Sequence, residues 1–145
     1  MCALELGKLN FEETLVHIDQ HTDMREPQKY LDNNLGEVSL DRVFQYTNKI
    51  LNVGNFIRPA LTSNIFKEVI MITNQEDFER TPNVPYALDL DMDIFSPEMN
   101  YISHNIKFNF IQSCLQSAKI ITIATSPYFI KQNLAIFLIK ELFDF

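Results

Sequence analysis

The sequence feature that most constrains the fold is a pair of aspartate-rich strings, each beginning inside a run of apolar and β-branched residues. They are His17-Ile-Asp19-Gln-His21-Thr-Asp23 and Asp89-Leu-Asp91-Met-Asp93-Ile-Phe95. The preceding apolar pairs, Leu15-Val16 and Ala87-Leu88, indicate buried strands. A buried carboxylate without a compensating charge is costly. The strings therefore predict strand ends where a divalent cation, or a pair of cations, balances the aspartates.

Strand-like and helix-like segments alternate along the chain and are joined by short loops. The predicted strands are Thr14–Asp19, Lys67–Thr73, Tyr86–Ile94 and Lys119–Ala124. This alternation is typical of an α/β domain with a mostly parallel sheet, and residues 1–145 suit a single domain.

Three helices are predicted between and after these strands. The first follows Ser39 as N-cap, has an apolar stripe and ends near Gly54. The second begins at Ser96-Pro97-Glu98 and continues to Leu115, and the third, Lys131–Phe143, is apolar on most sides and should be well buried. The polar segment Met24–Glu37 is predicted to be a loop.

Composition limits the cellular compartments and the classes of partner that the sequence predicts. The longest strongly apolar stretch, Leu134–Ile139, is too short to span a bilayer, and no secretion signal is recognisable, so no membrane partner is predicted. Two cysteines are too few for a disulfide framework, and Cys114 is expected to be a buried thiol in the cytoplasm. A net charge of −7 argues against nucleic-acid binding and is compatible with a cationic substrate.

The second string predicts how its carboxylates are arranged. Asp89, Asp91 and Asp93 are two residues apart and so share one face of a strand, with no basic residue in the string to pair with them. In parallel α/β sheets, ligands gather at the carboxyl ends of the strands, where the two strings can converge. Carboxylates with imidazole suit Mn²⁺, Fe²⁺ or Zn²⁺, and a pair of such ions activates water for hydrolysis. The alternative is that these acids cap helices or line a solvated loop.

The two strings, in this order, resemble the motifs of the arginase/ureohydrolase superfamily. The residue pattern is most similar to that of its peptide-arginase family. Two further segments, Thr122-Ile-Ala-Thr-Ser-Pro127 and Asn55-Phe56-Ile57 with Pro59, also look like family segments. The resemblance runs from about Leu15 to the last helix. It implies a three-layer αβα fold, reduced in size, and a binuclear Mn²⁺ site. It also implies hydrolysis of a guanidino C–N bond, with an arginine-containing peptide or a small guanidino compound as substrate and with urea and ornithine as products.

Carried over by position, the resemblance implies roles for six residues of the strings. Asp19 and Asp91 would bridge the two ions, His21 and Asp93 would complete one ion, and Asp23 would serve the other. His21 and Asp23 would also be the catalytic residues. Asp89 stands where a small polar residue is usual, so it would be a supporting group or an extra ligand.

The chain also departs from the family pattern. The family has a further metal-binding His on an earlier strand, and residues 1–14 contain no His. The second ion would then bind weakly or use another group, or the chain would be a truncated or degenerate copy. His17 could orient a ligand or simply pack within its strand, and His104 is expected to be a surface or core residue.

Two functional alternatives follow from these departures. The usual substrate-recognition Glu is absent, and Thr125-Ser126 stands near its position. A non-catalytic or vestigial metal-binding domain is therefore the alternative function. Metal-dependent deacylation ranks third, because the chain has no tandem His pair. Arg25 and Arg58 are expected to be solvated surface charges.

Overall fold

A computed structural model describes residues 2–31, 39–80 and 82–143 of the protein. Its centre is a four-stranded sheet in the order β2-β1-β3-β4, and every strand pair is parallel. The strands are β1 (Glu13–Ile18), β2 (Phe66–Ile72), β3 (Tyr86–Asp91) and β4 (Ile120–Ala124). The predicted strands therefore form within a few residues of their expected bounds, and the sheet is wholly rather than mostly parallel.

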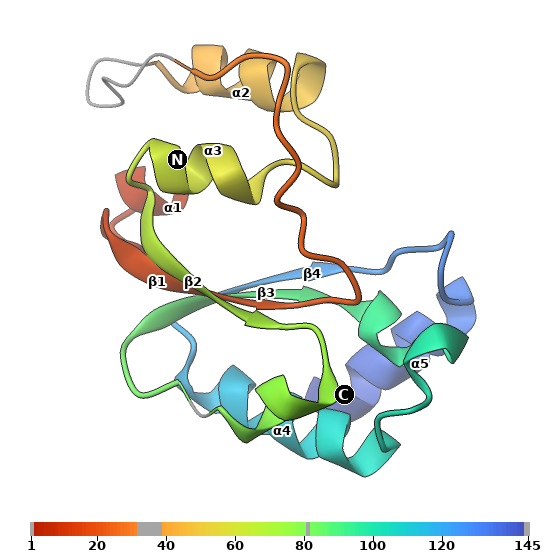
Figure 1. The fold of residues 1–145 in the computed structure, drawn as a ribbon. Helices are drawn as coiled ribbons and strands as arrows, with labels where there is room; N and C mark the ends of the chain where they lie inside the picture. The colour runs from red at the N-terminus through yellow and green to blue at the C-terminus, as the bar shows by residue number, and fades with distance from the viewer. Residues whose placement is uncertain (1, 32–38, 81, 144–145) are drawn as a thin grey trace.

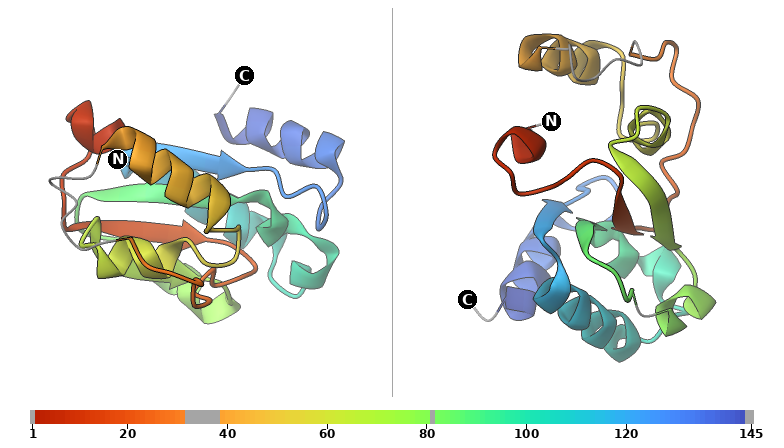
Figure 2. Two further views of the ribbon diagram at one scale, coloured as in Figure 1. Left: turned by 90° about the horizontal axis from the view of Figure 1, so that it is seen from above. Right: turned by 90° about the vertical axis from the view of Figure 1, so that its left-hand side faces the viewer.

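Helices cover both faces of the sheet and make three layers (Figure 1). On one side lie α1 (Cys2–Glu5), α3 (Ile57–Thr62) and, beyond α3, α2 (Leu40–Lys49). On the other side lie α4 (His104–Ser117), α5 (Gln132–Phe143) and the 3-10 helix η2 (Gln75–Glu79), as Figure 2 also shows from two further directions. The predicted three-layer α/β fold is confirmed.

The alternation of side chains along each strand builds two apolar cores. Val16 and Ile18 point toward α4 and α5 and belong to the larger core. Leu15 and Ala87 point toward α1 and α3 and belong to the smaller one. Residues two apart share a face, so His17 and Asp89, which are register partners on β1 and β3, lie on the side of the smaller core.

The segment after β3 differs from its prediction. The strand ends at Asp91 rather than continuing to Ile94, because the Asp91 side chain accepts a hydrogen bond from the N–H of Asp93 and caps a 3-10 helix, η3 (Met92–Phe95). The expectation that Asp89, Asp91 and Asp93 share one strand face is therefore wrong for Asp93. The turn instead buries Asp93 at the end of the sheet.

Two other helix boundaries were predicted wrongly. Ser96-Pro97 opens only a short 3-10 helix, η4 (Pro97–Met99), and α4 begins separately after Ser103. Helix α2 ends at Lys49, so Gly54 lies in the following loop rather than near the helix end. Part of the predicted loop Met24–Glu37 lies outside the described residues.

Helix α5 is less buried than its composition suggests. Ala135, Leu138 and Leu142 are buried, but Leu134 and Phe137 are exposed. The prediction of a well-buried helix is wrong because α5 packs one face on the sheet side and leaves the rest at the surface. Within the described ranges, no helix has the length and apolar character that a membrane crossing requires.

Candidate metal centre

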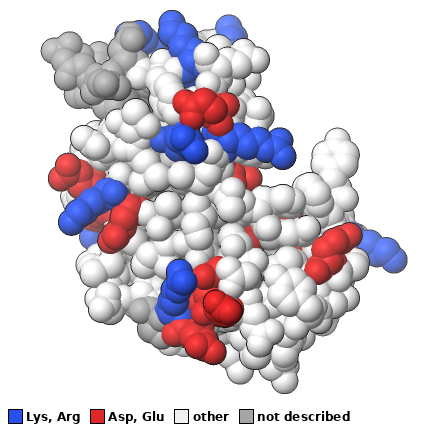
Figure 3. Space-filling view, in the orientation of Figure 1, with Lys and Arg blue, Asp and Glu red and all other residues white. Residues whose placement is uncertain are grey.

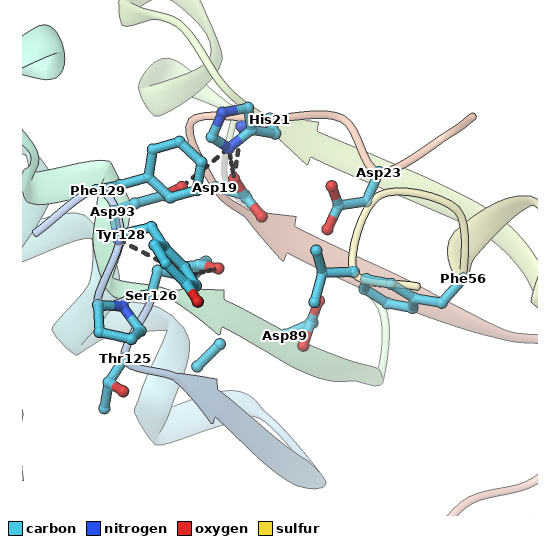
Figure 4. Close-up of a pocket in the computed structure, with 14 residues that line it drawn as sticks. Asp19, His21, Asp23, Phe56, Asp89, Asp93, Thr125, Ser126, Tyr128 and Phe129 are labelled. Carbon is cyan, nitrogen blue, oxygen red and sulfur yellow. Dashed lines mark hydrogen bonds and ion pairs between the residues drawn. The ribbon is translucent and has the colours of Figure 1, made fainter. Parts of the chain in front are cut away.

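The two aspartate strings converge at the carboxyl ends of β1 and β3, which are neighbours at the centre of the sheet. Asp19 directly follows β1, and Asp91 ends β3. Both line a pocket of about 520 Å³, and Figure 4 shows Asp19 in this pocket together with Asp23, Asp89 and Asp93. The convergence expected from the sequence is therefore present.

The first compact group consists of Asp19, His21 and Asp93. Each offers one ligand atom, and these atoms lie within 4.8 Å of one another. Nδ1 of His21 lies 3.2 Å from Oδ1 of Asp19 and 2.9 Å from Oδ2 of Asp93. Asp19 and Asp93 are buried, whereas the His21 side chain is 38% exposed and faces the pocket. This geometry brings two hard oxygen donors and one imidazole to a single point.

One oxygen of this group lacks a hydrogen bond. Oδ1 of Asp93 accepts the backbone N–H of Gln20 at 3.0 Å, but Oδ2 is buried and accepts none. The 2.9 Å approach of His21 to Oδ2 lacks hydrogen-bond alignment. A buried acceptor without a partner is unfavourable unless another positive group satisfies it. The donors present therefore fit a divalent cation.

The second compact group consists of His17, Asp19 and Asp23, whose ligand atoms also lie within 4.8 Å of one another. Asp19 thus belongs to both groups. Asp23 has a left-handed backbone (φ 50°), a conformation that Asp tolerates better than most residues. From the sequence, His17 could either orient a ligand or pack within its strand. In the structure its ring contacts Asp19 of the acidic cluster.

Asp89 and Asp91 line the pocket but belong to neither compact group. Oδ2 of Asp91 accepts the Ser126 hydroxyl at 2.5 Å, and its Oδ1 accepts the N–H of Asp93. Asp89 accepts one hydrogen bond from the Thr122 hydroxyl and contacts His17. The structure therefore brings four of the six predicted metal ligands into compact groups and leaves Asp89 and Asp91 outside them, bonded to other protein groups.

Burial and crowding of like charge disfavour ionised carboxylates here. The pKa of Asp19 is raised to about 9, mainly by burial. The hydrogen bond from the backbone N–H of His21 lowers this pKa, whereas the charges of Asp93, Asp91 and Asp23 raise it further. Burial also raises the pKa of Asp23 and of Asp91. A bound cation would reverse this effect by favouring the ionised forms.

Aromatic and apolar side chains form the remaining walls of the pocket. Figure 4 shows Phe56 on the side of Asp89 and Asp23, and Phe129 beside His21. The ring centroids of His21 and Phe129 are 4.7 Å apart, and Tyr128 is almost fully exposed at the rim. The sequence pattern did not assign Phe129, Tyr128 or Thr122 to the site. Thr122 and Pro127 belong to the segment that resembles the family, and Thr125-Ser126 within it stands near the position of the absent Glu.

The remaining candidates lie outside this cluster. His104 is exposed on α4, between the rings of Phe95 and Phe108, and does not line the pocket. Arg58 pairs with Glu26 and donates to the carbonyl of Met24. On the face seen in Figure 3, the described Lys and Arg side chains are dispersed among acidic and uncharged ones and form no continuous basic surface.

Fold and site together define a class: a small, parallel α/β domain with a carboxylate and histidine cluster at the carboxyl ends of its central strands. Comparison with protein-family models, curated proteins and solved structures finds no match for this chain.

Proposed function

We propose that this protein is a metal-dependent hydrolase of guanidino C–N bonds that converts arginine in a peptide to ornithine with release of urea. The observation that carries the proposal is the convergence of Asp19, His21 and Asp93 beside the pocket, with Oδ2 of Asp93 buried and without a hydrogen bond. The resemblance of both strings to the peptide-arginase motifs supports the same reaction. We infer Mn²⁺ as the metal and the cytoplasm as the setting, consistent with the buried free thiol of Cys114.

Divalent ions held by these donors would supply Lewis-acid activation of water. The protein residues provide binding and orientation around them. Asp19 belongs to both compact groups, so it is suited to holding two ions near each other. The N–H of His21 donates to Asp19, and the N–H of Gln20 donates to Asp93, so the backbone after β1 keeps both carboxylates in place.

The pocket supports a cationic, planar substrate. Its lining contains five aspartates and no Lys or Arg among the described residues. A guanidinium is attracted by this charge, and its flat face packs well against aromatic rings such as Phe56 and Phe129. The carboxylate of free arginine would be repelled by the acidic lining, whereas an arginine inside a peptide carries none next to its side chain.

The test is Mn²⁺ reconstitution without oxygen, followed by mass spectrometry of arginine-containing peptides and an assay for urea. We expect bound Mn²⁺ and a Mn²⁺-dependent mass loss corresponding to conversion of arginine to ornithine. D93N should abolish the conversion, whereas D41N, which changes an exposed aspartate on α2, should retain it. Failure to bind any divalent metal would refute the proposal.

The second candidate is a metal-binding domain without catalytic activity. The observation that favours it is Asp91, the expected second bridging ligand, whose two oxygens are both hydrogen-bonded to other groups. This candidate predicts bound metal and no urea from any arginine peptide or free guanidino compound. The same reconstitution experiment therefore separates the two functions.

A further inference from the structure

Both ring nitrogens of His17 face hydrogen-bond acceptors. The residue is completely buried in β1. Nδ1 lies 2.9 Å from Oδ2 of Asp89, and Nε2 lies 3.2 Å from the carbonyl oxygen of His21 and 3.4 Å from Oδ2 of Asp19. A neutral imidazole has only one N–H. One nitrogen would therefore direct a lone pair at oxygen atoms, which is unfavourable in a buried site.

The hydrogen bonds around Asp89 indicate which nitrogen carries the proton. The Thr122 hydroxyl donates to Oδ1 of Asp89 at 2.6 Å, and so helps to hold this carboxylate as an acceptor next to His17. The shortest contact of the His17 ring is the one between Nδ1 and Asp89. We therefore assign the N–H to Nδ1, which leaves the lone pair of Nε2 directed at Asp19 and the His21 carbonyl. A carboxylate that orients a histidine in this way is the usual arrangement behind a metal-binding imidazole.

Either a second proton or a metal ion would resolve the conflict at Nε2. A proton adds one positive charge beside a cluster that contains Asp19, Asp23, Asp89, Asp91 and Asp93. A divalent cation adds two, and it also uses the oxygen atoms already directed at Nε2. Asp23 completes this set, because ligand atoms of His17, Asp19 and Asp23 lie within 4.8 Å of one another. The charge balance and the donor set both favour the cation.

We propose that Nε2 of His17 is a ligand of a second divalent cation, held together with Asp19 and Asp23. His17 would then take the place of the histidine that is absent from residues 1–14. The two sites differ in their histidines, because His17 is fully buried whereas His21 is partly exposed. Asp89 and Thr122 are positioning residues that orient His17. The inference rests on the metal binding in the proposed function, but not on its chemistry.

Metal stoichiometry tests the inference without an activity assay. Equilibrium dialysis against Mn²⁺ should give two bound ions per chain for the wild type and one for H17A. The double variant D93N/H17A should bind no ion. D89N should lower the affinity for the second ion by about 10- to 100-fold and leave the affinity for the first ion unchanged. H104A, which removes the exposed histidine on α4, is the matched control and should bind two ions.

A second measurement uses the unmodified protein, in case H17A does not fold. With a spin-active cadmium isotope and nitrogen-labelled histidine, NMR should show metal–nitrogen coupling at Nε2 of His17 and at His21, and none at His104. Coupling at His21 alone, or two Mn²⁺ ions bound to a folded H17A, would overturn the inference and leave the first metal site standing. Absence of any bound metal would overturn both the inference and the proposed function.

Discussion

Nδ1 of His21 and Oδ2 of Asp93 lie 2.9 Å apart, although one follows β1 and the other follows β3. The contact exists because β1 and β3 are hydrogen-bonded neighbours and both strings leave the sheet at its carboxyl end. No hydrogen bond joins the two atoms. A group that binds both would therefore stabilise the folded protein, and this relationship underlies the first two predictions.

Asp19 is expected to be the most sensitive metal ligand. It belongs to both compact groups, so D19N should lose both Mn²⁺ ions, whereas D93N should lose only the ion that His21 also binds. Without metal at pH 7, the wild type must protonate Asp19 on folding because its pKa rises from 3.8 to about 9, which costs free energy. Asparagine is neutral in both states, so metal-free D19N should melt at a higher temperature than the metal-free wild type. Dialysis and thermal melting with and without Mn²⁺ measure both effects. A D19N protein that still binds two ions would contradict the shared role of Asp19.

The metal-free protein should lose stability as the pH rises from about 5 to 9. The pKa of Asp19 is raised from 3.8 to about 9, and those of Asp23 and Asp91 are raised too. Between the unfolded and folded pKa values the folded state binds more protons, so its stability decreases with increasing pH. Mn²⁺ should reverse this trend, because metal binding competes with these protons. Urea denaturation across this pH range measures the effect, and an unchanged slope with Mn²⁺ would contradict it.

Lys107 is expected to hold the segment that carries Asp93. Its ammonium group is buried and donates to the carbonyl oxygens of Ile94 and Met99 at 3.0 and 2.9 Å. K107M would leave both carbonyls without this donor and should destabilise the protein by about 1–3 kcal/mol. K140M, at an exposed position of α5, should change stability by less than about 0.5 kcal/mol. Urea denaturation measures both; equal stabilities would argue against this role of Lys107.

Phe129 is expected to contribute to substrate binding. Its ring packs against His21 at the pocket wall, and it is partly exposed. F129A should raise KM for an arginine peptide about three- to tenfold, as expected for loss of a contact between a cation and an aromatic face, and should change kcat less. F44A removes an exposed phenylalanine on α2 and is the matched control. A KM for F129A equal to that of F44A would exclude Phe129 from the substrate site.

The sequence was sufficient to predict most of the sheet. Runs such as Val69–Ile72 and Ile120–Ile123 are rich in β-branched residues, and this local preference survives in the fold as β2 and β4. Helix ends were harder to predict. At Ser96-Pro97 the local signal for a helix start is strong, yet only a 3-10 turn forms there, and α4 begins at His104.

The candidate site, too, could be predicted only in part from the sequence. Its aspartates could be recognised because several carboxylates next to apolar runs are unusual and need a counter-charge. His17 could not be assigned in this way, because a strand histidine that packs and one that binds metal look alike in sequence. Its partner Asp89, and Thr122 that donates to Asp89, come together with it only because β3 lies between β1 and β4.

The candidate metal centre formed by the two aspartate strings depends on both the local sequence and the tertiary structure. The sequence by itself determined that carboxylates and histidines follow two buried strands, since residue type and spacing are local properties. Only the tertiary structure decided that Asp19 is common to two groups and that Asp93 leaves the strand to face His21. Strand order and the capping turn at Asp91 set those distances, and both depend on contacts between segments far apart in the chain.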